Sequence, residues 1–142
     1  MIEIRRSAIV RYTATQMFDL VNDIEAYPRR FSWCAGADVL AREPQALTAR
    51  LELRIAGMTT QFTTRNTLEP PQRIDMQLVE GQFRQLRGAW IFTMLGDGCK
   101  VALELDFDYA GKLLAPVMRS GFQKLADRMV DEFCREAERA YG

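Results

Sequence analysis

The fold is decided by residues 46–55, which read ALTARLELRI. Apolar and polar side chains alternate without a break from Leu47 to Ile55, and a period of two is typical of a strand with one buried face. Half-buried strands of this kind belong to antiparallel sheets, because parallel strands are usually buried on both faces. The apolar set is Leu47, Ala49, Leu51, Leu53 and Ile55, and the polar set is Thr48, Arg50, Glu52 and Arg54.

The same alternation continues as far as Tyr109. Turn signals interrupt it at Gly57, at Pro70-Pro71, at Gly81 and at Gly96-Asp97-Gly98. The pattern therefore predicts a series of antiparallel strands joined by short connections. These further strands are expected from residue 58 until Pro70-Pro71 ends the strand, and at 74–78, 86–94 and 101–107.

The chain before residue 46 predicts two more strands and two short helices. Residues 2–12 alternate imperfectly and predict the first strand, and residues 37–43 predict the second. Thr13 or Thr15 offers an N-cap for a short helix. Pro28 disfavours a helical conformation in the residue before it, and it can begin a second helical turn that runs to about Phe31. The apolar stripe of the first helix is Met17, Phe18, Leu20 and Val21.

From about Leu113 to Tyr141 the apolar period becomes three or four, which predicts one long amphipathic helix. Such a helix can cross the apolar face of the sheet. We therefore expect one α+β domain over residues 1–142, in which six to seven curved antiparallel strands form a cup and the C-terminal helix closes it. The apolar stripe of this helix is Leu114, Met118, Phe122, Leu125, Met129, Phe133 and Ala137.

Composition sets limits on function. Apolar residues make up 48% of the chain and charged residues 27%, which is ordinary for a globular domain. The net charge is zero, so no overall attraction to DNA or to an anionic membrane is expected. Three widely spaced cysteines fit reduced thiols, and no signal peptide or membrane span is recognisable, so the cytoplasm is the expected location.

The chain contains no histidine. This excludes a Ser-His-Asp triad, zinc sites of the Cys/His kind and the usual proton-transfer group near neutral pH. Three acidic side chains, Glu104, Asp106 and Asp108, share one strand face, but they lie opposite the apolar register and are expected to be solvated. No metal site and no catalytic residue is predicted.

Large, polarizable side chains gather on the predicted inner face of the cup. They can form a solid core or can line a pocket for an apolar ligand, since methionine adapts to varied partners. Thr60, Thr64 and Gly88 in the same register favour a cavity, because small and hydroxylated residues leave space there. The candidate ligand-binding residues are Phe62, Met76, Trp90, Phe92, Met94, Met118, Phe122, Leu125 and Met129, with Phe31 and Trp33 in a loop beside the mouth, where they can also be ordinary anchors.

Seven motifs along the chain carry a resemblance to a known family. They are Val10-Arg11-Tyr12-Thr13, Met17 to Asp23, Tyr27-Pro28, Phe31-Ser32-Trp33-Cys34, Leu86 to Phe92, Gly96 to Tyr109 and Val130 to Gly142. These motifs resemble the coenzyme Q-binding START-like family, which is related to polyketide cyclases and dehydrases and has a bacterial ribosome-association toxin branch. The resemblance spans nearly the whole chain. Arg29-Arg30 departs from it, because related sequences are shorter or more apolar there.

The resemblance implies a helix-grip fold of the START and Bet v type, with two short helices after the first strand. It also implies a protein without catalytic activity that binds ubiquinone or another polyprenyl lipid and supports respiratory quinone function. No cofactor is required, and a transient contact with the inner membrane surface is a further expectation. An alternative from the same resemblance is a toxin-like protein that binds the large ribosomal subunit and blocks subunit joining. A cyclase-like enzyme is a third reading, which needs a carboxylate buried in the pocket.

Overall fold

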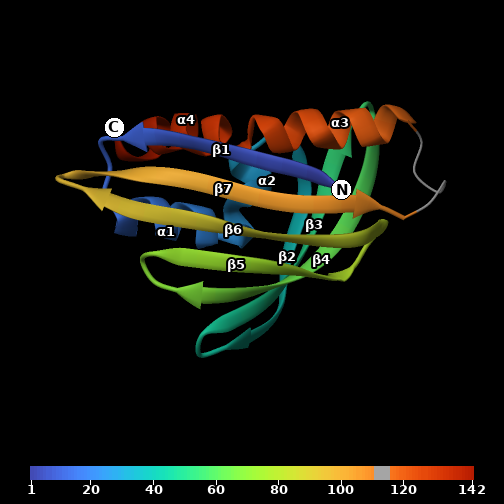
Figure 1. Cartoon of the computed structure of the whole chain (residues 1–142), viewed down its shortest axis with the longest axis horizontal. Coiled ribbons are helices and arrows are strands. Elements are labelled where there is room, and N and C mark those ends of the chain that lie inside the picture. Colours follow the sequence, from blue (N-terminus) through green and yellow to red (C-terminus); the bar gives the residue numbers. More distant parts are fainter. Residues whose placement is uncertain (111–115) are drawn as a thin grey trace.

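The computed structural model describes residues 1–110 and 116–142, which form a curved antiparallel sheet with helices packed against it (Figure 1). Within these residues seven strands lie in the order β1-β7-β6-β5-β4-β3-β2. The predicted sheet of six to seven antiparallel strands is confirmed. The strands are β1 (Ile2–Val10), β2 (Cys34–Glu43), β3 (Ala46–Ile55), β4 (Met58–Glu69), β5 (Arg73–Glu80), β6 (Phe83–Leu95) and β7 (Gly98–Tyr109).

The connection between β1 and β2 contains the two short helices expected from the sequence. α1 spans Ala14–Asn22 and α2 spans Tyr27–Arg30, and a 3₁₀ turn, η1 (Ile24–Ala26), joins them. Thr13 is the N-cap of α1. Its hydroxyl accepts a hydrogen bond from the Gln16 amide, and the Gln16 side chain accepts one from the Thr13 amide. This reciprocal capping fixes where the chain turns from strand to helix.

The C-terminal helix is divided in two, so the prediction of one continuous helix is wrong. α3 spans Pro116–Asp127 and α4 spans Met129–Tyr141. Between them Arg128 has φ −104° and ψ 7°, and its amide donates to Leu125 O, three residues back. A bond of this span tightens the last turn of α3 and redirects the chain. The expected start at Leu113 and the stripe position Leu114 lie outside the described residues.

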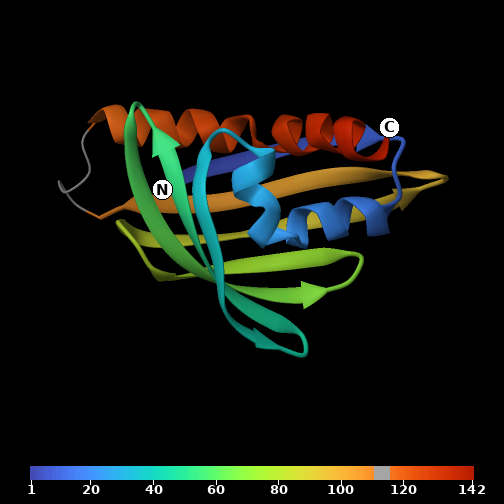
Figure 2. The ribbon, with the colours of Figure 1, turned by 180° about the vertical axis from the view of Figure 1, so that it is seen from behind.

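The helices lie on the concave side of the sheet, as the view from behind shows (Figure 2). α1 contacts β6 and β7, and α4 contacts α1, β1 and β7, so the core is enclosed between sheet and helices. The alternation in 46–55 is confirmed: Leu47, Ala49, Leu53 and Ile55 are buried. The β6–β7 hairpin turns at Gly96, whose φ of +58° is a conformation that glycine adopts without strain.

Two strand limits matter for the site. β2 begins at Cys34 rather than at residue 37, with an irregular register between Cys34 and Gly36. β4 runs to Glu69 and ends before Pro70-Pro71, as expected, which places Asn66 in the core at 6% exposure.

Candidate functional site

A cavity of about 110 Å³ lies in the core between the sheet and the helices. Its wall is mainly apolar and draws side chains from the five strands β3 to β7, from α1, η1 and α2, and from α3 and α4. The structure brings together seven of the residues expected from the sequence to bind a ligand. They are Trp33, Phe62, Met76, Trp90, Phe122, Leu125 and Met129.

Three other candidate residues are buried but do not line the cavity. Phe31 stacks on Trp33, with ring centroids 4.8 Å apart, and therefore supports the wall from behind. Phe92 packs against Phe18 of α1, with centroids 5.8 Å apart. Met118 is 6% exposed and belongs to the packed core.

Met94 lies outside the site. It keeps the register of the inner face, opposite Cys99, but the residue is 71% exposed and does not line the cavity as expected. The end of the β6–β7 hairpin extends beyond the helices (Figure 1). Gly88 also does not open space, because Leu105 lies over it. A Cβ at Gly88 would meet Leu105 Cδ1 at 2.9 Å and Glu104 O at 2.5 Å.

An aromatic cluster forms one wall of the cavity. Phe133 of α4 lies edge-on to Tyr27 of α2, with centroids 5.4 Å apart, and to Trp90 of β6, with centroids 5.2 Å apart. Tyr27 also meets Trp33 edge-on at 6.0 Å. Edge-to-face pairs add to the stability that burial alone provides. This wall therefore fixes α2 against α4 and the sheet.

The wall also contains polar groups, of which Thr64 was expected from the sequence and Asn66 and Asn22 were not. The Thr64 hydroxyl donates to Asn66 Oδ1 at 2.8 Å, so these two side chains partly satisfy each other. Asn22 Oδ1 and Trp33 Nε1 are buried and have no hydrogen-bond partner among the described residues. Asn66 could have been found by extending the alternation of β4 past Thr64. No sequence signal distinguishes Asn22 from other residues at the end of a helix.

The volume of the cavity limits what it can enclose. An apolar cavity of about 150 Å³ can hold a benzene molecule, and pockets for larger ligands measure about 300–1,000 Å³. At about 110 Å³ this cavity is the size of a small ring. A polyprenyl lipid does not fit inside it in the conformation described.

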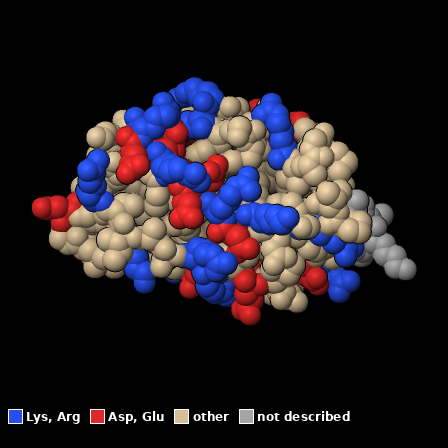
Figure 3. All heavy atoms as spheres, turned by 90° about the horizontal axis from the view of Figure 1, so that it is seen from above, with Lys and Arg blue, Asp and Glu red and all other residues tan. Residues whose placement is uncertain are grey.

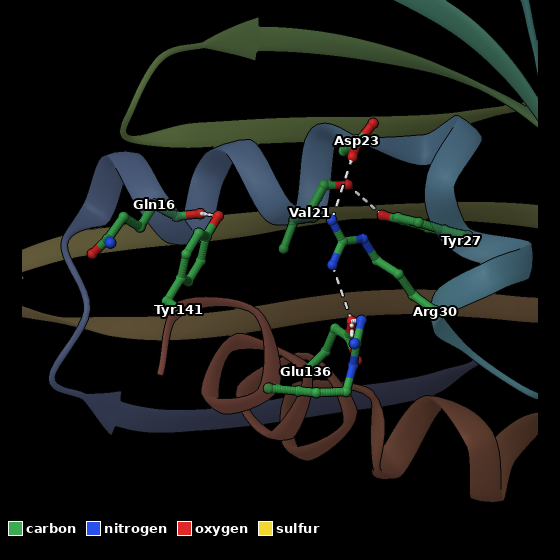
Figure 4. Close-up of polar contacts among 8 residues, drawn as sticks. Gln16, Val21, Asp23, Tyr27, Arg30, Glu136 and Tyr141 are labelled. Carbon is green, nitrogen blue, oxygen red and sulfur yellow. Dashed lines mark hydrogen bonds and ion pairs between the residues drawn. The ribbon is translucent and has the colours of Figure 1, made fainter.

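A charged cluster next to the aromatic wall joins α2 to α4 (Figure 4). Glu136 is 6% exposed and accepts hydrogen bonds from Arg30 Nη1 at 3.0 Å and from Arg139 Nε at 3.0 Å. Arg30 also lies 3.8 Å from Asp23, although its Nε is buried without a partner in the described chain. Hydrogen bonds from Arg139 and then from Arg30 hold the pKa of Glu136 below its usual range, against the effect of burial. We call Arg30, Glu136 and Arg139 the latch.

The titratable groups near the cavity are poorly suited to catalysis. Burial raises the pKa of Tyr27, whose hydroxyl donates to Val21 O. Burial, with a smaller effect from Asp131, raises the pKa of the Cys134 thiol to about 11, and burial also raises the pKa of Cys34 and Cys99. All three cysteines are therefore neutral thiols at pH 7 and weak nucleophiles.

Within residues 1–110 and 116–142, no three side chains of the metal-ligating types lie close enough to hold an ion. None of the helices in the described part of the chain is long and apolar enough to cross a membrane.

Positive and negative side chains are interleaved on the face that carries α3 and α4 (Figure 3). Arg135 pairs with Glu132 at 2.8 Å, and Arg6 of β1 reaches Asp127 of α3 at 2.7 Å. This face therefore resembles the neutral composition of the whole chain.

Residues 10–134 match the model of a protein family described as polyketide cyclase / dehydrase and lipid transport. The chain belongs to this family. The match covers every strand except most of β1, and the resemblance to START-like, polyketide cyclase-like proteins is confirmed.

The chain is similar over nearly its full length to three further proteins. Ribosome association toxin RatA from Pseudomonas aeruginosa is 41% identical over 98% of this chain and 97% of its own. Coenzyme Q-binding protein COQ10 homolog B, mitochondrial, from Xenopus laevis is 24% identical over 99% of this chain and 60% of its own. The structure of Zhui aromatase/cyclase from a Streptomyces species aligns with a TM-score of 0.81 at 18% identity, covering 99% of this chain and 96% of that one. The last likeness shows the fold alone.

Proposed function

We propose that this protein acts on the ribosome, by binding the large subunit and hindering its joining to the small subunit. The observation that carries this proposal is the similarity to Ribosome association toxin RatA, 41% identical over nearly the full length of both chains. The coenzyme Q-binding relative is much more distant, at 24% identity. This role would place the protein in the cytoplasm.

The neutral charge makes a prediction about how such binding would behave. A protein that holds RNA through many phosphate contacts loses affinity steeply as salt rises. This chain carries 19 basic and 19 acidic residues, and they are interleaved on the α3–α4 face (Figure 3). We therefore expect a shape-dependent contact whose affinity changes little with salt concentration.

Sedimentation through a sucrose gradient tests the ribosomal role. Purified protein is mixed with separated large subunits, with separated small subunits and with both together. The expected result is co-sedimentation with the large subunit and a smaller peak of joined ribosomes. Protein that stays at the top of the gradient with both subunits, at low and at moderate salt, would rule the role out.

A second function is carriage of an apolar guest, and the observation that favours it is the mainly apolar cavity. Burial of apolar surface contributes about 25 cal/mol per Å², which is enough to hold a ring-sized molecule. Ubiquinone or a similar isoprenoid lipid would need a wider cavity, because about 110 Å³ cannot enclose its tail. Native mass spectrometry and solvent extraction of the purified protein test this role. A protein free of bound molecules that also takes up no added ring compound would contradict it.

We propose binding rather than catalysis for the cavity. A cyclase-like reaction needs a group that moves protons. Among the described lining residues Tyr27 is the one titratable side chain, and its hydroxyl is engaged with Val21 O. The carboxylate that the enzyme reading required does not line this wall.

A further inference from the structure

We propose that the cavity selects a ring-sized guest that carries both a hydrogen-bond donor and a hydrogen-bond acceptor, and that Asn22 and Trp33 make the selection. This inference rests on the second function proposed above, binding of a guest in the cavity. It concerns which guest is taken, and it points away from a long lipid.

Two buried polar atoms of the cavity wall have no hydrogen-bond partner among the described residues. Trp33 is 4% exposed and its Nε1–H has no acceptor among the described residues. Asn22 Oδ1 is likewise buried and has no donor. Both residues line the same cavity. Because buried polar groups are nearly always paired, two unpaired atoms of opposite kind in one cavity indicate a missing partner.

The other two polar side chains in the wall are paired within the protein. Thr64 and Asn66 come from the same strand and bond to each other at 2.8 Å, so the cavity can contain polar side chains without leaving them unpaired. Asn22 ends α1, and Trp33 precedes β2. These two residues come from the connection between β1 and β2.

The two unpaired atoms differ in the kind of hydrogen bond that each can make. Trp33 can only donate, and Asn22 Oδ1 can only accept. A phenol, a reduced quinol or an azole offers both functions, whereas the ring of an oxidised quinone has only acceptors and would leave Asn22 Oδ1 unpaired. A site that hydrogen-bonds its guest rejects analogues lacking the polar group far more strongly than it rejects a changed methylene.

The volume of the cavity limits the size of the guest. The cavity measures about 110 Å³, which limits the guest to a small single ring. A water molecule also fits this volume and also carries donors and acceptors. The experiment must therefore separate a ring compound from water.

The test is titration of the intact protein with phenol, pyridine and benzene, which have similar size and different hydrogen-bonding groups. Affinity is measured by nuclear magnetic resonance, with the indole N–H signal of Trp33 as reporter. The chain has two tryptophans, so the Trp33→Phe variant assigns that signal. We expect phenol to bind about tenfold more tightly than benzene and pyridine. Phenol and pyridine should move the Trp33 N–H signal downfield, as a hydrogen bond to an acceptor does, whereas benzene should cause only a ring-current shift without that downfield movement.

The Asn22→Leu variant keeps the volume of the side chain and removes the acceptor. In this variant the preference for phenol over benzene should fall to about threefold or less, with benzene affinity unchanged. Circular dichroism establishes that the variant is folded. An unfolded variant would transfer the test to the Trp33→Phe protein, which should lose the phenol preference in the same way.

The outcomes are distinguishable. If benzene binds as well as phenol, or if Asn22→Leu keeps the preference, the selection is refuted while guest binding stands. If none of the three compounds binds, the cavity holds water alone, and both the selection and the proposed carriage are refuted.

Discussion

Glu136 and Asn22 are both polar side chains of the interior, but their surroundings differ. The carboxylate of Glu136 accepts hydrogen bonds from Arg30 and Arg139, and it joins α2 to α4 (Figure 4). Asn22 Oδ1 lines the cavity and has no partner in the described chain. The Glu136 carboxylate has its partners within the described chain, and Asn22 Oδ1 does not.

The difference follows from the cost of each unpaired group. A buried charge without a partner costs several kcal/mol, which is a large share of a total stability of about 5–15 kcal/mol. A neutral amide oxygen without a partner costs about 1–3 kcal/mol, which a folded protein can sustain. Unpaired neutral groups can therefore be kept for a ligand, whereas Glu136 must be satisfied by the fold. The predictions below test this contrast.

The largest effect is expected at the aromatic wall. Phe133→Ala should lower the free energy of unfolding by about 4 kcal/mol, because it removes a ring that is 1% exposed and leaves a void. Urea denaturation measures the loss. The enlarged cavity should also bind benzene more tightly. Phe92→Ala is the matched control, since Phe92 is buried but does not line the cavity, and it should lose similar stability without that gain. Equal gains in benzene binding by both variants would contradict the placement of the wall.

Breaking the ion pairs of the latch should lower the free energy of unfolding by nearly as much. Glu136→Gln removes the negative charge that faces Arg30, whose side chain is 18% exposed, and should cost about 3 kcal/mol in urea denaturation. The control is Glu132→Gln on the same helix, which breaks a pair with the exposed Arg135. That change should cost about 0.5 kcal/mol or less. If the two variants lose the same stability, the latch is no stronger than a surface ion pair.

The pH dependence of stability isolates the charge of Glu136. Its pKa is lowered in the folded protein, so its stabilising contribution is complete above the unfolded value of about 4.3 and is lost as pH falls through the folded pKa. The difference in unfolding free energy between the native protein and Glu136→Gln should therefore shrink below about pH 4.3. Denaturation at several pH values between 3 and 7 measures it. A constant difference over this range would show that the charge contributes nothing.

The smallest effect should have the opposite sign. Asn22→Leu removes an unpaired buried oxygen without a large change in volume, and it should raise the free energy of unfolding by about 1 kcal/mol in the absence of any guest. Thermal and urea unfolding both measure the gain. A loss of stability instead would mean that Asn22 has a structural partner.

Most of the sheet could be predicted from the sequence because alternation is a local property. Every second residue from Leu47 to Ile55 faces the core, as predicted. The turns at Gly57 and Gly96-Asp97-Gly98 lie where expected. The prediction failed at a position where the strand alternation continues but no helix covers the side chain in the described structure. Met94 continues the alternation of β6 but lies on a hairpin that no helix covers in the described structure (Figure 1).

The candidate site was predicted in part for the same reason. Trp90, Phe122 and Met129 were identified from their registers, and all three line the cavity. Asn22 and the latch residue Glu136 were not, because nothing in a single helix shows which polar side chain will be buried by another element. Arg30 was noted as a departure from related sequences, and its partner on α4 became visible only in three dimensions.

The sequence by itself determined the order of strands and helices, the buried face of each strand and the family of the chain, because periodicity and motifs are written along the backbone. The tertiary structure decided how much space remains between those faces and which polar atoms are left in it. Volume and hydrogen-bond pairing depend on residues as far apart in the sequence as Asn22 and Phe133, which line one cavity only when the sheet curves around the helices.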